Sequence, residues 1–190
     1  MNSLDRACFD SLETREGSGE KSGLMQIGFV VEDRERTMRD LSAMLGAGPW
    51  FLSPHPYPEP PLTEYRGVPV LLGAKFALSY AGDLMIELIE PQPGSKTVFS
   101  DALAANGTSL HHFAFGTTNF DATVATLERD GRAPIFRSTT ARGARIAMSE
   151  SAAWNGALEE HIELTTESVA YYESMRQAAR TWNGCDLIAT

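Results

Sequence analysis

Four polar side chains with the chemistry of metal ligands interrupt apolar stretches of this 190-residue sequence: Gln26, Glu87, His112 and Glu163. An amide oxygen, an imidazole nitrogen and two carboxylates form a mixed donor set. Such a set suits Zn²⁺, Ni²⁺, Co²⁺, Mn²⁺ or Fe²⁺ and leaves room for one or two waters. Burying an unpaired carboxylate is costly, so a glutamate between core residues needs water, a cation or another partner. The four residues therefore predict one divalent metal site.

An internal repeat relates these positions in pairs. A displacement of 86 positions aligns Gln26 with His112 and Phe29 with Phe115, and a displacement of 76 positions aligns residues 86–88 with residues 162–164. Self-similarity of this kind indicates duplicated structural units. Duplicated modules commonly pack about a pseudo-two-fold axis, so we expect the equivalent positions to meet in a shared cleft.

The alternation of strand residues gives each candidate ligand a face. With a period of two, Glu87 lies opposite Ile86 and Leu88, and Glu163 lies opposite Ile162 and its apolar neighbours. Simpler explanations remain for the four residues taken singly: an edge position for each glutamate, a hydrogen-bonded core role for the glutamine and a structural role for the histidine. Their equivalent places in the repeat favour the metal site.

Hydrophobic periodicity predicts an α+β chain of two βαβββ modules. We expect a flexible leader (1–23), a first module (24–94), a linker helix (95–109), a second module (110–166) and a C-terminal helix with a tail (167–190). The proline-rich stretch 49–61 predicts a rigid loop or an edge strand. The expected strands are 25–31, 75–80, 84–90, 110–117, 134–138, 144–149 and 161–165, and the expected helices are 32–45, 95–106, 121–129 and 167–182.

Composition excludes several classes of protein. The formal net charge of -9 leaves no basic face for nucleic acid, and no apolar run approaches the ~20 residues that cross a membrane. Two cysteines, Cys8 and Cys185, lack close partners. The first residues lack the pattern of a signal peptide, so we expect a cytoplasmic location.

The motifs around these residues resemble the vicinal oxygen chelate superfamily, which includes glyoxalase I, methylmalonyl-CoA epimerase, extradiol dioxygenases and bleomycin-resistance proteins. The resemblance covers about residues 24–166. It is carried by QIGFVVED from Gln26, GDLMIELIEP from Gly82, HHFAF from His111 and HIEL from His161.

The resemblance implies a cup-shaped, mostly antiparallel sheet, a homodimer and one ligand on the first and last strand of each module. The set Gln26, Glu87, His112 and Glu163 resembles the ligands of glyoxalase I, whereas the surrounding motifs look closer to the epimerase. The expected function is that of a divalent-metal-dependent lyase or isomerase/epimerase, which removes a proton next to a metal-bound carbonyl or enediolate.

Several residues are candidates for proton transfer. Glu163 is favoured as the base and Glu87 is the alternative, while His161 could be an acid/base group or a surface residue. Glu64 lies where epimerase-like relatives carry a base or substrate contacts. His111 is expected to be a packing residue.

The substrate expected from the resemblance is a small carbonyl, hydroxy-acid or thioester compound. A coenzyme A thioester would need basic groups at the mouth of the cleft, and the candidates are Arg66, Lys75, Arg137, Arg142 and Arg145. A metal-free binding protein that sequesters a small molecule is the second hypothesis, with the stretch 50–57 as a pocket wall. A ring-cleaving dioxygenase is the third, disfavoured because Gln26 replaces a histidine ligand. The C-terminal helix with Tyr172 is expected to cover the sheet or to form a dimer contact.

Overall fold

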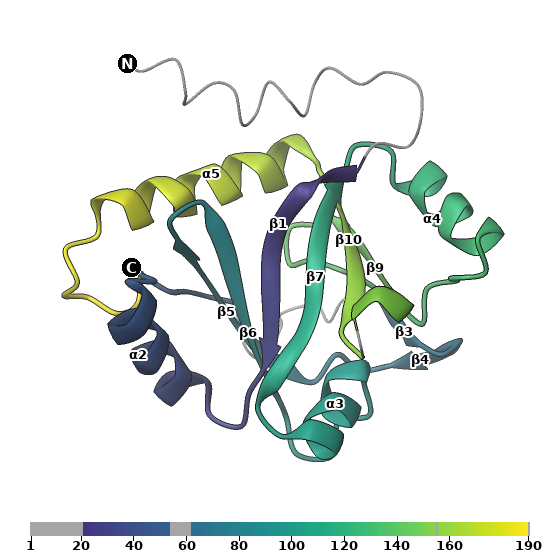
Figure 1. The fold of residues 1–190 in the computed structure, drawn as a ribbon, viewed down its shortest axis with the longest axis horizontal. Coiled ribbons are helices and arrows are strands. Elements are labelled where there is room, and N and C mark those ends of the chain that lie inside the picture. The colour runs from purple at the N-terminus through teal and green to yellow at the C-terminus, as the bar shows by residue number, and fades with distance from the viewer. Residues whose placement is uncertain (1–20, 54–61, 155, 190) are drawn as a thin grey trace.

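The computed structural model describes residues 21–53, 62–154 and 156–189. Within these residues one ten-stranded sheet has the strand order β2-β5-β6-β1-β7-β10-β9-β8-β3-β4. The sheet is strongly curled, and the helices surround it (Figure 1). The predicted α+β fold with a cup-shaped sheet is confirmed.

Two equivalent four-stranded units make up most of the sheet. The first contains β1 (Lys21–Val30), β2 (Phe51–Leu52), β5 (Ala74–Ala81) and β6 (Leu84–Pro91). The second contains β7 (Ser109–Thr117), β8 (Phe136–Thr139), β9 (Arg145–Glu150) and β10 (Leu158–Glu163). In each unit the first strand pairs in parallel with the last, and β1 joins β7 in an antiparallel pair at the centre.

In the described ranges four α-helices accompany the sheet: α2 (Arg34–Leu45), α3 (Val98–Asn106), α4 (Phe120–Arg129) and α5 (Thr166–Thr181). Asp33 caps the start of α2 by accepting a hydrogen bond from the backbone of Arg36, and Gly46 ends it in a left-handed conformation. Met38 of this helix is fully buried in a cluster with Ile86 of β6. Among the described residues, no helix is both long enough and apolar enough to cross a membrane.

A hairpin that the sequence did not predict connects the two units. β3 (Thr63–Tyr65) and β4 (Val68–Val70) lie between β2 and β5 in the chain, yet β3 pairs with β8 of the second unit. The hydroxyls of Thr63 and Ser138 lie 2.8 Å apart and support this pairing. The hairpin therefore ties a segment of the first module to the second.

Aromatic side chains from both units meet inside the sheet. The ring of Phe99 from α3 lies 5.8 Å from that of Phe76 and 5.2 Å from that of Phe136, both in edge-on contact. Val30 and Met148 belong to the same buried cluster. Burial of this apolar surface holds the two units together.

Most predicted boundaries lie within two residues of those observed, and only β1, α3 and β10 begin three or more residues from the predicted position. β1 begins at Lys21, so the end of the predicted leader belongs to the sheet, while residues 1–20 lie outside the described part of the chain. The proline-rich stretch contributes the edge strand β2, in agreement with the prediction of a loop or an edge, and residues 54–61 are not described. The last strand, expected at 161–165, spans Leu158–Glu163, so it begins three residues earlier than predicted.

Candidate metal centre

Three of the four predicted ligands converge where β6, β1 and β7 lie side by side. Gln26 donates a hydrogen bond from Nε2 to Glu87 Oε2 at 3.1 Å, and the same nitrogen lies 3.2 Å from His112 Nε2. A different carboxylate completes the group: Oε2 of Glu160 in β10 lies 3.2 Å from His112 Nε2, and Glu87 Oε2 lies 3.5 Å from that nitrogen. We call Gln26, Glu87, His112 and Glu160 the central cluster.

The parallel strand pairs explain why Glu160 takes this place. Gly28 pairs with Glu87 in the first unit, and Ala114 pairs with Glu160 in the second. Gly28 and Ala114 each lie two residues after the central-cluster residue of their own strand. The two glutamates therefore occupy equivalent positions, and their residue numbers differ by 73 rather than by the 76 of the predicted repeat.

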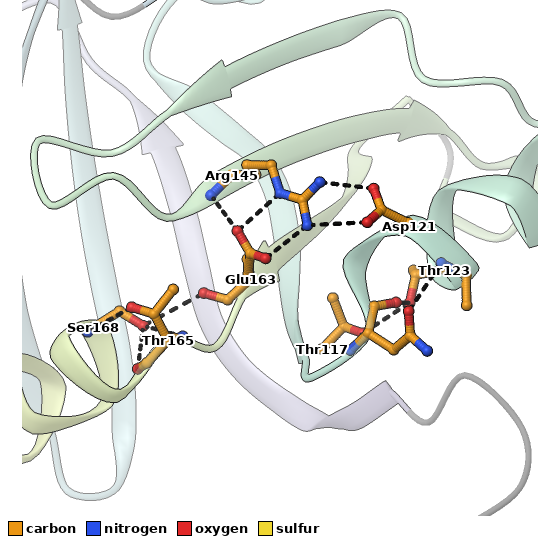
Figure 2. Close-up of polar contacts among 9 residues, drawn as sticks. Thr117, Asp121, Thr123, Arg145, Glu163, Thr165 and Ser168 are labelled. Atoms are coloured by element: carbon orange, nitrogen blue, oxygen red, sulfur yellow. Dashed lines mark hydrogen bonds and ion pairs between the residues drawn. The ribbon is translucent and has the colours of Figure 1, made fainter.

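An error of three residues moves a side chain to the other face of a strand, because strand residues alternate. Glu163 accordingly lies on the outer face and does not join the central cluster, contrary to the prediction. Arg145 binds it through Nε at 2.9 Å and Nη2 at 2.7 Å, and Asp121 of α4 lies 2.7 Å from Nη1 of the same arginine (Figure 2). Hydrogen bonding to Arg145 lowers the pKa of Glu163. This carboxylate serves to link β9, β10 and α4.

The other two predicted acid/base candidates also lie outside the central cluster. His161 shares the outer face with Glu163; it is fully buried, and its Nε2 lies 2.9 Å from Oε1 of Glu159. Glu64 is exposed in β3 and borders an outer groove near α4. Neither residue lines the pocket that contains the central cluster.

His111 supports the central cluster from the opposite face of β7. Its Nδ1 lies 2.9 Å from Nδ1 of His112, and its ring centre lies 5.0 Å from that of Phe99. Burial, together with the charge of His112, lowers the pKa of His111 to about 3. A neutral His111 can accept a hydrogen bond from His112 Nδ1, which would leave His112 Nε2 free to bind a metal.

Gln26, Glu87 and Glu160 of the central cluster line a pocket of about 440 Å³ inside the curled sheet, and His112 beside them is fully buried. Its walls are largely apolar and include Leu72, Phe76 and Phe136. Among the described residues Arg142 is the only cation that lines it, and the guanidinium of Arg142 lies over the ring of Tyr171.

Arg142 has an acidic partner, since its Nη1 lies 3.6 Å from Oε1 of Glu167, and the other predicted basic contacts for a coenzyme A group have acidic partners too. None of these other basic residues lines the pocket of the central cluster. The pairs are Lys75 with Glu90, Arg137 with Glu128, Arg145 with Glu163 and Arg66 with Glu150.

Burial changes the proton affinity of the cluster. It raises the pKa of Glu87 to about 8, with attraction to His112 opposing this shift and repulsion from Glu160 adding to it. Burial disfavours the charged form of His112, yet its contacts with Glu160 and Glu87 outweigh burial and raise its pKa. Without a cation, the cluster therefore holds protons more tightly than the same groups do in water.

The donor set fits a divalent cation. One donor atom from each of Glu87, His112 and Glu160 lies within 4.8 Å of the others. Oε2 of Glu160 is buried and has no hydrogen bond, which is costly for a carboxylate. The amide of Gln26 would bind a cation through its oxygen after a half-turn of its terminal torsion, which exchanges the positions of Oε1 and Nε2.

A glycine provides the space for the histidine ring. Gly28 pairs with His112 across the β1–β7 junction, and a Cβ atom at this position would overlap the imidazole. The imidazole would have to move to accommodate that atom, so the absence of a side chain here is a requirement of the cluster.

We expect Gly28→Ala to weaken the binding of Zn²⁺ by at least about tenfold, because the displaced imidazole would lose its position among the carboxylates. Titration calorimetry on chelator-treated protein measures the affinity, and circular dichroism checks the fold. Gly23→Ala is the matched control, since its new Cβ would meet open space in the same strand. Equal affinities of Gly28→Ala and the parent protein would contradict this role.

The stability of the metal-free protein should fall as the pH rises from about 5 to about 8. The folded protein retains a proton on Glu87 that the unfolded chain releases near its ordinary pKa of about 4.3, and the raised pKa of His112 acts in the same direction. Urea unfolding in the presence of a chelator measures the effect. Glu87→Gln should flatten the dependence, and a parent protein that became more stable over this range would refute the assignment.

Comparisons with known proteins support the architecture. The chain aligns with a crystal structure of the hypothetical protein BH1468 from Bacillus halodurans C-125 at 21% identity and a TM-score of 0.59, covering 75% of this chain and 94% of that one. Methylmalonyl-CoA epimerase from Mycobacterium tuberculosis aligns at 17% identity and a TM-score of 0.63, covering 84% and 99%. A variant of the Streptomyces coelicolor epimerase, in complex with 2-nitronate-propionyl-CoA, aligns at 21% identity and a TM-score of 0.61, covering 77% and 100%. These likenesses show the fold.

No curated protein sequence gives a significant match. A family profile described as the Glyoxalase/Bleomycin resistance protein/Dioxygenase superfamily matches residues 25–148. That match covers more than half of the chain and includes Gln26, Glu87 and His112. The chain therefore belongs to the glyoxalase/bleomycin resistance protein/dioxygenase superfamily.

Proposed function

We propose that this protein is a divalent-metal-dependent isomerase or epimerase that moves a proton at a carbon atom next to a carbonyl group. The observation that carries the proposal is the central cluster, in which His112 Nε2 lies 3.2 Å from Glu160 Oε2 and 3.5 Å from Glu87 Oε2 in a pocket with apolar walls. A lyase of the glyoxalase type would share this proton-transfer step. The methylmalonyl-CoA epimerases among the structural neighbours favour the isomerase.

The residues that would hold the cation are Glu87, His112 and Gln26, with Glu160 as a further ligand that a bound substrate would displace. A cation bound there would supply Lewis-acid stabilisation of negative charge on a substrate oxygen. His111 would orient the imidazole of His112 through the contact between their Nδ1 atoms. The apolar walls would exclude water and so strengthen each charge interaction inside the pocket.

Glu160 is the base in this proposal. Apart from the contact with His112 Nε2 at 3.2 Å, its Oε2 has no hydrogen bond, whereas Glu87 Oε2 accepts one from the Gln26 amide. Oε2 of Glu160 is therefore the carboxylate oxygen available to take a proton from the substrate. Glu160 replaces Glu163, the base expected from the sequence.

The pocket favours a compact substrate. A small carbonyl acid, hydroxy acid or short thioester fits the apolar walls and can place its oxygens at the central cluster. The Streptomyces coelicolor epimerase is described in complex with a coenzyme A thioester. In the described part of this chain, Arg142 is the only one of the five predicted basic groups that lines the pocket, so we favour a substrate with a single anionic group at that end. The homodimer and the cytoplasmic location stay predictions.

A metal-free binding protein is the second candidate. Gln26 and His112 already contact the cluster carboxylates without a cation, and the apolar pocket could retain a small molecule. This candidate predicts ligand binding that survives removal of metal, with no turnover. Metal analysis separates the two functions.

We expect near-stoichiometric divalent metal in protein purified without an affinity tag that binds metal. Elemental analysis should find this metal lost in His112→Ala, because the only imidazole of the central cluster is removed. Glu163→Gln is the control on the outer face and should retain the metal. Protein that carries no metal, and takes up none of Zn²⁺, Ni²⁺, Co²⁺, Mn²⁺ and Fe²⁺, would leave the binding protein as the better interpretation.

Glu160→Gln should slow proton transfer by roughly 10²-fold or more, since the amide keeps an oxygen donor and loses the capacity to accept a proton. The measurement is deuterium exchange at the α-carbon, recorded by NMR in D₂O. The substrates are 2-hydroxy acids, 2-oxo acids and methylmalonyl thioesters. Glu163→Gln should exchange at the parental rate. Exchange that is equally fast in Glu160→Gln would exclude Glu160 as the base.

A further inference from the structure

Helix α5 forms one wall of the pocket, although it lies beyond residue 148, where the family match ends. Ser168, Tyr171 and Tyr172 of this helix line the same pocket as Glu87 and Glu160. Figure 1 shows α5 extending across the ends of the strands of the first unit. The helix is therefore a part of the site that the superfamily match does not include.

Tyr172 is the residue of α5 whose chemistry fits the pocket. It is 9% exposed, and in the described part of the chain its hydroxyl has no hydrogen-bond partner. The hydroxyl oxygen is not among the fully buried polar atoms that lack a partner, so water or a ligand in the pocket can reach it. A pocket-lining phenol without a protein partner is available to a ligand.

The charge around Tyr172 keeps its proton in place. Burial raises the pKa of this phenol, and the negative charges of Glu160 and Glu87 raise it further. At neutral pH the hydroxyl is therefore a donor. Tyr172 lines the same pocket as Glu160 and Glu87, so a ligand in that pocket can contact the phenol and the carboxylates together.

Several contacts hold α5 in a fixed position. The hydroxyl of Thr165 accepts a hydrogen bond from the backbone of Ser168 at 3.1 Å, and that of Ser168 accepts one from the backbone of Thr165 at 2.9 Å, a reciprocal cap. Met175 is fully buried, and Arg180 pairs with Asp83 at 3.2 Å. Tyr172 is therefore presented by a packed helix, which suits a preorganised donor.

We propose that Tyr172 donates a hydrogen bond to the substrate oxygen that lies at the central cluster. The proposal rests on the proposed function, because it names the group that would stabilise negative charge on the same oxygen during proton transfer. A preorganised donor in a pocket that excludes water contributes more in the charged state than in the neutral one. No covalent bond to Tyr172 is involved, and its proton stays on the phenol oxygen.

Oxalate is the probe, because it is a small dianion with two adjacent oxygens that chelate a divalent cation. Both proteins are loaded with the metal that elemental analysis identifies. Tyr172→Phe should then bind oxalate about tenfold more weakly than the parent protein, because it lacks one hydrogen bond to a charged group. Titration calorimetry gives the affinity. In deuterium exchange, Tyr172→Phe should lower kcat by a larger factor than it changes KM, because the lost hydrogen bond is strongest while the substrate oxygen is charged.

Tyr80→Phe is the matched control. Tyr80 is a buried phenol of β5 in the same apolar cluster as Tyr172, but it does not line the pocket and lies under Arg176. Its substitution should leave oxalate affinity and exchange at the parental values. Metal content and unfolding midpoints of both variants check that the site and the fold persist.

The outcomes separate the two proposals. Equal oxalate affinity in Tyr172→Phe and the metal-loaded parent would overturn the role of Tyr172 and leave the proposed function standing. If the metal-loaded parent exchanges substrate protons but does not bind oxalate, an unchanged kcat in Tyr172→Phe leads to the same conclusion. A parent protein that takes up no divalent metal would overturn both.

Discussion

The antiparallel pairing of β1 with β7 is the contact on which the site depends. It joins the two units and places Gly28 beside His112, where the missing side chain leaves space for the imidazole. Each of these central strands then pairs in parallel with the last strand of its unit, which brings one glutamate to each side. A change of register at this junction would move ligands to the outer face, since strand faces alternate. One pairing thus fixes both the fold and the donor geometry.

The sequence predicted the first strand of each unit well and the last strand of the second unit poorly. The apolar pattern around Gln26 and His112 repeats closely enough to give the right displacement. In β10 the residues Glu159, Glu160 and His161 do not resemble a buried strand, yet all three are buried. Arg132 lies 2.9 Å from Glu159 and so supplies a partner on the outer face that single-sequence periodicity cannot show. Residues 162–164 resemble residues 86–88 more closely than residues 159–161 do. The predicted repeat therefore matched the apolar residues and assigned Glu163, instead of Glu160, to the position equivalent to Glu87.

Contacts between distant segments explain the other features that the sequence left unpredicted. The β3–β4 hairpin forms because β8 offers an edge, and Tyr65 reaches Asp101 of α3 at 2.9 Å. The amphipathic pattern of α5 predicted a helix that covers the sheet or forms a dimer contact, but not which of its side chains would line the pocket. Tyr172 packs in an apolar cluster and also lines the pocket. Periodicity detects the ring and gives no information about the hydroxyl.

The negative charge of the buried central cluster can be neutralised either by protons or by a cation. Two carboxylates near one imidazole leave a negative excess in a pocket with apolar walls, and the raised pKa of Glu87 shows that protons can neutralise it. A divalent cation would neutralise the same excess and release those protons, so metal affinity and pH are coupled in this pocket. Glu163, held by Arg145 on the outer face, has its charge balanced within the protein and offers no such coupling. The difference between these two glutamates of one strand follows from which face each occupies, and it is the physical reason for assigning the chemistry to Glu160.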